Sequence, residues 1–211
     1  MWSEAFEVGS LLLVLLNPFA LSVYLMDLMR ELELRSVIGV MVRAGLVSAV
    51  VFVVFAWTGD QIFRDVLHVR FASFQVFGGL VFLLIAMRFM LGGSQTFVVL
   101  RGEPEHLAGT VAMPFMIGPA TISGAIIAGA RLDALWAIAT IAVVVVSCVG
   151  VLIVLKVVFD GVRARNVKLV ERYVDIMGRV AALLAGTIAV DMIFQGLERW
   201  LTREGGAVGL P

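Results

Sequence analysis

The sequence predicts an all-α membrane protein with six transmembrane helices, arranged as two three-helix repeats of inverted topology. Three observations predict this fold class. The 211-residue chain is 61% hydrophobic and only 15% charged. It contains six apolar windows of roughly 20 residues, the length that crosses about 30 Å of hydrocarbon. It also carries two similar proline motifs, one in each half. Soluble domains are about 45–50% apolar and about 25% charged, so a water-soluble globule is excluded.

Composition also excludes several function classes. The 16 lysine and arginine residues balance 16 acidic residues, so the chain has no basic surface for nucleic acid. The single cysteine, Cys148, and the distant histidines His68 and His106 provide neither a disulfide framework nor a metal site. No Ser-His-Asp set or HExxH pair is visible. We therefore expect no enzyme, no metal and no cofactor other than a coupling H⁺ or Na⁺.

The six apolar windows mark the transmembrane spans, in chain order. A lipid-exposed backbone must satisfy its own hydrogen bonds, so each window is expected to be a helix. The windows lie at about residues 5–27, 37–58, 71–91, 107–130, 134–155 and 174–197. They divide into a first repeat at about 5–91 and a second at about 107–197. Residues 1–201 then form a single six-span domain, and residues 202–211 are expected to be a disordered tail.

The distribution of basic residues predicts the orientation in the membrane. With the N-terminus outside, eleven of the 16 lysine and arginine residues fall on the cytoplasmic side. This positive-inside bias places both termini outside. We expect a multi-pass protein of the cytoplasmic (inner) membrane, in contact with the lipid bilayer; whether it forms a homo-oligomer stays open.

Two internal matches indicate a repeat. The motif NPFALS at residues 17–22 matches GPATIS at 118–123, with an offset of 101 residues. FQVFG at 74–78 matches VDIMG at 174–178, with an offset of 100. Because each half has an odd number of spans, the second half must enter the membrane from the opposite side. Inverted repeats of this kind build many secondary transporters.

Pro18 and Pro119 fall about midway along the first and fourth spans and are expected to break both helices. Proline lacks an N–H and clashes with the preceding turn. A simple kink is the alternative, but Asn17 and Gly118 before the prolines favour non-helical geometry. Freed amides and carbonyls near the midplane suit the carboxylate and ammonium of a small zwitterion. The expected substrate-binding residues are Asn17, Pro18, Phe19, Ala20, Ser22, Gly118, Pro119, Ala120, Thr121 and Ser123.

Further polar residues lie in or near the spans, where ionisable groups are functional candidates. The candidates for coupling or gating are Asp191, Gln195, Arg43, Arg88 and Asp175. Gln195 lies one helical turn beyond Asp191 on the same face. Two interpretations of Asp191 stay open: it carries a coupling proton, or it satisfies a neighbouring helix. For Arg43, Arg88 and Asp175, a gate or relay competes with snorkelling to the interface.

With these motifs, the chain resembles the MarC family of bacterial and archaeal inner-membrane proteins, which includes small neutral amino acid transporters. The resemblance rests on LLNPFALSVYL, FQVFGGLVFLLIAMRFML, MPFMIGPATI and MGRVAALLAGTIAVDMIFQGL. It implies six spans, an inverted repeat, a fold like that of lysine-exporter-type transporters, and a transport site lined by the broken helices. The chain departs from the usual family motifs at Ala20, Val23, Ala120 and Asp191.

These observations lead to one main functional hypothesis and two alternatives. The main one is an ion-coupled secondary transporter of a small neutral amino-acid-like solute, working by alternating access around the two broken helices. The first alternative is a lipid-linked carrier or flippase built from the same helices. The second is a structural or regulatory membrane subunit that transports nothing.

Overall fold

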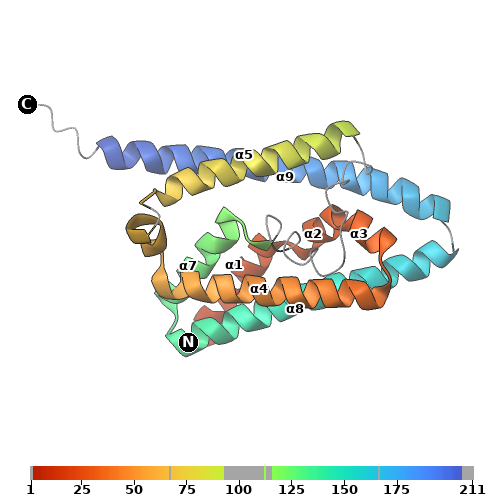
Figure 1. The fold of residues 1–211 in the computed structure, drawn as a ribbon, viewed down its shortest axis with the longest axis horizontal. Helices are drawn as coiled ribbons and strands as arrows, with labels where there is room; N and C mark the ends of the chain where they lie inside the picture. Colours follow the sequence, from red (N-terminus) through yellow and green to blue (C-terminus); the bar gives the residue numbers. More distant parts are fainter. Residues whose placement is uncertain (1, 67, 93–111, 113–115, 166, 206–211) are drawn as a thin grey trace, which may run out of the picture.

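The computed structural model describes residues 2–66, 68–92, 112, 116–165 and 167–205. This part of the chain consists of helices and connecting turns, without a strand (Figure 1). The elements are α1 (Trp2–Leu16), α2 (Pro18–Tyr24), α3 (Met26–Glu31), α4 (Leu34–Thr58), the π-helical turn η1 (Ile62–Val66), α5 (Phe71–Gly92), α7 (Pro119–Arg131), α8 (Ala134–Arg165) and α9 (Val167–Gly205). The all-α fold class is confirmed for the described residues.

Four stretches are long and apolar enough to cross a membrane. They are Trp2–Ser22, Leu34–Thr58, Phe71–Arg88 and Ala134–Ala164, which correspond to the first, second, third and fifth predicted windows. The sixth window lies inside α9, and α7 contains most of the second half of the fourth. Most of the first half of the fourth window lies outside the described residues.

The helices extend further than the apolar windows. α8 continues to Arg165 and α9 begins at Val167, whereas the windows end at 155 and begin at 174. α9 also extends to Gly205, four residues into the predicted tail. The remaining residues of the tail are not among the described residues. The apolar windows mark only the segments that cross the hydrocarbon layer. A helix can extend beyond that layer, because its backbone hydrogen bonds also form in water.

Antiparallel pairing organises the molecule (Figure 1). α4 runs beside α8, and α7 packs against both of them. α1 packs against α7 and α8, while α5 lies along α9 as a further pair. Glycines allow these approaches: a Cβ at Gly45 of α4 would lie 2.9 Å from Val149 of α8, and one at Gly129 of α7 would overlap the backbone of Ala56. Small residues are the usual contact points between membrane helices, because dispersion contacts between closely packed backbones hold such helices together.

The core lies between α4 and α8, and its pattern recurs along the chain. α4 buries Val37, Val40, Met41, Ala44, Gly45, Ser48, Phe52 and Ala56. Each of these positions has a buried counterpart 100 residues later: Ala137, Thr140, Ile141, Val144, Val145, Cys148, Leu152 and Lys156. The two helices therefore present the same face, in the same register, to the centre of the bundle.

Candidate functional site

The first helix break lies at Asn17. α1 ends at Leu16 and α2 begins at Pro18, while Asn17 between them has a φ of 42°. Pro18 has no N–H, so the carbonyl of Val14 cannot receive the bond that would continue α1. Asparagine is one of the few residues besides glycine that adopts left-handed geometry readily. The predicted break in the first span is confirmed.

Asn17 closes one helix and opens the next. Its N–H donates to the carbonyl of Leu13 at 3.0 Å, which completes α1. Its carbonyl accepts the N–H of Leu21 at 3.0 Å, and its side-chain Oδ1 accepts the N–H of Ala20 at 3.1 Å. Asn17 is therefore the N-cap of α2, a position that asparagine favours because its side chain satisfies an otherwise unpaired amide.

The second proline motif lies at the start of α7, directly after Gly118, and most of the preceding residues of the fourth window lie outside the described part of the chain. Gly118 is extended (φ −126°, ψ 169°), and Pro119 follows as the first residue of α7, the helical position that tolerates proline best. The Thr121 hydroxyl accepts the N–H of Gly118 and lies 2.9 Å from the carbonyls of both Met116 and Gly118. The Asn17 side chain accepts an amide from the first turn of α2, whereas Thr121 is the third residue of α7 and accepts the amide of the residue that precedes the helix.

Most of the predicted polar site residues are engaged in this capping. Ser22 is buried and donates to the carbonyl of Phe19 at 2.7 Å. Ser123 differs, because its Oγ is buried and has no hydrogen-bond partner among the described residues. A buried hydroxyl without a partner costs free energy, so Ser123 is the side chain of this set whose hydrogen bonding is incomplete among the described residues.

The two proline motifs lie in neighbouring parts of the bundle. A Cβ at Gly124 of α7 would lie 2.9 Å from Leu12 and 3.0 Å from Leu15 of α1. The last turns of α1 therefore pack on α7, five residues or roughly 8 Å after Pro119. α5 joins them from the other side, because a Cβ at Gly78 would overlap the ring of Pro119. The start of α7 is thus contacted by two helices from the first half of the chain.

The remaining predicted site residues are divided between interior and surface. Gly118, Pro119 and Thr121 are buried, whereas Asn17, Pro18, Ala20 and Ala120 are half-buried. Phe19 is 68% exposed and points out of the bundle. It lies on the outer side of α2, a helix of seven residues or about two turns. The inner face of α2 includes Leu21 and Ser22, an orientation that the motif alone does not specify.

The predicted coupling and gating residues whose side chains are described lie on the surface. Arg43 on α4 and Arg88 on α5 are exposed. Asp191 and Gln195 on α9 are also exposed, and Gln195 Nε2 donates to Asp191 Oδ2 at 2.7 Å, which confirms that they share a face. Asp175 lies in α9, but its side chain is outside the description. No group of three or more metal-ligating side chains occurs among the described residues.

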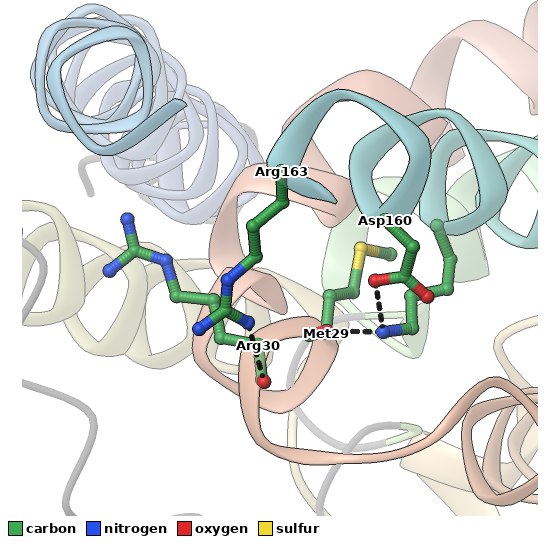
Figure 2. A network of polar contacts seen from close by, with 5 residues as sticks. Met29, Arg30, Asp160 and Arg163 are labelled. Carbon is green, nitrogen blue, oxygen red and sulfur yellow. Dashed lines mark hydrogen bonds and ion pairs between the residues drawn. The ribbon is translucent and has the colours of Figure 1, made fainter. Parts of the chain in front are cut away.

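A polar site that the sequence analysis did not single out lies at the end of α3 (Figure 2). Lys156 of α8 is 3% exposed, and its Nζ donates to the carbonyl of Met29 at 2.6 Å and to Asp160 Oδ1 at 2.7 Å. Arg163 donates to the carbonyl of Arg30 at 3.0 Å. The last carbonyls of a helix lack partners and carry partial negative charge. Two cations of α8 therefore cap α3.

The sequence contained part of the signal for this site. Lys156 and Asp160 have the i, i+4 spacing of a helical ion pair, and Lys156 is the charged member of an otherwise apolar run. The partner on α3 lies 127 residues away, which helical spacing does not predict.

Comparison with known proteins adds an independent observation. The family model described as "MarC family integral membrane protein" matches residues 2–201. A UPF0056 membrane protein from Pyrococcus horikoshii is 29% identical over 161 residues, covering 74% of this chain and 73% of that protein. No solved structure matches the chain.

Proposed function

The chain belongs to the MarC family of integral membrane proteins, and from this premise we propose that it is a secondary transporter of a small neutral amino-acid-like solute. The helix break at Asn17 and the start of α7 directly after Gly118 support the proposal. Interrupted helices are tolerated in a membrane where they line a cavity or are enclosed by protein. In transporters, such half-helix ends bind the polar groups of the solute.

The chemistry of the breaks favours a zwitterion. The start of each half-helix carries partial positive charge from its first amides, which suits a carboxylate. The carbonyls that precede each proline suit an ammonium group. In this proposal the Ser123 hydroxyl contributes a hydrogen bond to the solute, while Asn17 and Thr121 act as positioning residues that hold the half-helices in place.

Alternating access around these breaks is supported by relations between the two halves. The buried face of α4 recurs in α8 after 100 residues. α4 packs on α7, and α1 packs on α8 in the same way. If the two halves are inverted three-helix repeats, the first span corresponds to the fourth, which contains α7, and α4 corresponds to α8. The contact of α4 with the fourth span is then the counterpart of the contact of α8 with the first span. Rocking of one repeat against the other, coupled to H⁺ or Na⁺, would then open the breaks to each side in turn.

The test is uptake by the purified full-length chain in proteoliposomes. Labelled glycine, alanine and serine are offered under an H⁺ or a Na⁺ gradient. We expect uptake of at least one of them. A hydrogen bond to a charged group contributes about 1.5–3 kcal/mol, so Ser123→Ala should weaken solute affinity by about ten- to a hundredfold.

The chain provides a matched control for this substitution. Ser48 is also buried, but its hydroxyl donates to the carbonyl of Ala44 within α4. Ser48→Ala should leave solute affinity unchanged. Absence of uptake by the unmodified chain for every solute under both gradients would refute the transporter proposal. Equal affinities of the two alanine variants would remove Ser123 from the site.

A further inference from the structure

One charged side chain is buried among those that the structure describes, and it belongs to Lys156 of α8. A buried ammonium is costly unless it has polar partners. Its Nζ has two of them: the Met29 carbonyl of α3 at 2.6 Å, and the Asp160 carboxylate of its own helix at 2.7 Å (Figure 2). Lys156 therefore joins α8 to the end of α3.

The repeat places a different contact at the matching position of the other half. The offset of 100 residues that relates α4 to α8 pairs Lys156 with Ala56. The offset of 101 between the proline motifs pairs Leu28, next to Met29, with Gly129 of α7. A Cβ at Gly129 would overlap the backbone of Ala56, so α7 packs directly on α4. Backbone packing closes this junction, and a lysine closes its counterpart.

The helices at the two junctions also differ in continuity. α7 runs unbroken from Pro119 to Arg131, whereas its counterpart in the first half is divided at Leu25 into α2 and α3. α3 has six residues, too few for a helix that is stable by itself. Its position therefore depends on the contacts it makes, and it can turn about Leu25 without disturbing α2.

α3 covers the interior of the bundle beyond the break at Asn17. Leu25, Leu28 and Met29 are buried. They belong to the same core cluster as Leu16, the last residue of α1 before the break. In the proposed orientation, the end of the bundle that carries α3 is the cytoplasmic one. Movement of α3 away from α8 would uncover this part of the core from the cytoplasm.

The bond from Lys156 to α3 can open without leaving a bare charge. Asp160 lies one turn further along α8, with its side chain 41% exposed, so it stays beside Lys156 when α3 moves. The ammonium then exchanges one carbonyl for water and keeps its ion pair. The contact of Arg163 with the Arg30 carbonyl is exposed, and water can replace it as well. The packed backbones at Gly129 gain no such polar partner on separation.

We propose that α3 is the cytoplasmic gate of the transport path and that Lys156 is the latch that holds it closed. The inference rests on the proposed transport function and adds its control at one side of the membrane. In the closed state, Lys156 caps α3, while Leu28 and Met29 fill the core. In the open state, α3 turns about Leu25, and Lys156 remains paired with Asp160. Lys156 is thus a positioning residue that acts through α3.

The first experiment measures access to the core behind α3, without any solute. In a Cys148→Ala background, the reporter is Leu25→Cys, and Ala125→Cys, at a buried position of α7, reports general loosening. Inside-out vesicles are treated with a membrane-impermeant maleimide. Lys156→Met removes a hydrogen bond from a charged donor, so it should speed labelling of Leu25→Cys by about tenfold or more. Labelling of Ala125→Cys should not change.

Arg163→Met is the matched control, because it removes the exposed cap of the same helix. It should change the labelling of Leu25→Cys little. Equal acceleration of both reporters by Lys156→Met would indicate loosening of the whole fold. No acceleration, or the same acceleration by Arg163→Met, would show that Lys156 is not a latch. Each of these outcomes would overturn the proposal.

The second experiment keeps Lys156 and locks the gate. Arg30→Cys and Arg163→Cys, in the Cys148→Ala background, are joined in proteoliposomes by a bifunctional maleimide with a reducible spacer. Uptake of labelled glycine, alanine and serine should stop on cross-linking and return after reduction, while a monofunctional maleimide should permit it. Undiminished uptake by the cross-linked chain would overturn the gate and leave the transporter proposal standing. Absence of uptake before cross-linking would count against the transporter proposal, and the labelling experiment would still decide the role of Lys156.

Discussion

Asn17 shows how much one residue contributes to the architecture. It carries the left-handed φ of 42° that separates α1 from α2, and its side chain caps α2. At the start of α7, the Thr121 hydroxyl accepts the N–H of Gly118, the residue before the helix, at 2.9 Å. The two motifs match in sequence position, although their side chains bond different backbone amides.

The two roles of Asn17 can be separated by substitution. Asn17→Ala removes the cap, which costs about 1 kcal/mol. It also replaces a residue that adopts left-handed geometry readily with one that does not, which costs up to about 1–2 kcal/mol. Asn17→Gly relieves the second cost and changes capping by only a few tenths of a kcal/mol. We expect the alanine variant to lose about 2–3 kcal/mol of unfolding free energy and the glycine variant much less. Denaturation in mixed micelles, followed by tryptophan fluorescence, measures both; equal losses would contradict this division of roles.

At the scale of the elements, the short helix α3 depends on α8. α3 has six residues, fewer than an isolated helix needs to be stable in water. Its last carbonyls are capped by Lys156 and Arg163, as Figure 2 shows. The side chain of Lys156 is 3% exposed, whereas the Arg163 contact is exposed to solvent.

This difference in burial predicts unequal effects of the same substitution. Lys156→Met leaves the Met29 carbonyl without its donor in a buried place, which costs about 1–3 kcal/mol. Arg163→Met removes a solvent-exposed contact, whose loss costs about 0–1 kcal/mol. The unfolding free energy should therefore fall clearly for the first variant and little for the second. Hydrogen exchange of α3 amides gives a local readout, and faster exchange is expected in Lys156→Met alone.

At the scale of the whole molecule, the outer surface is apolar. Exposed side chains include Val14 at 71% and Val146 at 70%. In water, such patches promote association, but they are the expected surface of a multi-pass membrane protein. A hydrocarbon environment also explains why the interior relies on small-residue contacts and polar caps: burial of apolar surface alone gains little when the alternative is lipid.

The proposed orientation, with both ends of the chain outside, predicts a labelling pattern. In a Cys148→Ala background, Ser3→Cys on α1 and Thr202→Cys on α9 should react with a membrane-impermeant maleimide in intact cells. Ala164→Cys at the far end of α8 should react only after the membrane is opened. All three positions are exposed. Labelling of Ala164→Cys in intact cells, with protection of the other two, would reverse the orientation.

The sequence by itself determined the features that depend on local chemistry. Apolar length predicted the spans, of which four are found as long apolar helices. The Asn-Pro motif predicted the break between α1 and α2, and the Gly-Pro motif predicted the start of a helix at Pro119, because proline removes a backbone donor wherever it stands. Helical spacing predicted the shared face of Asp191 and Gln195. The motifs together predicted the family, which the match over residues 2–201 confirms.

Only the tertiary structure decided which of these side chains already have hydrogen-bond partners and which face outwards. Thr121 and Ser22 turned out to be engaged with backbone carbonyls, Phe19 faces outwards, and Ser123 has no partner among the described residues. The cap of Lys156 on Met29 joins residues 127 positions apart. Such outcomes depend on which helices meet and in what rotation. A hydrogen bond or a buried face is a relation between two segments, and the periodicity of either segment alone does not specify the other.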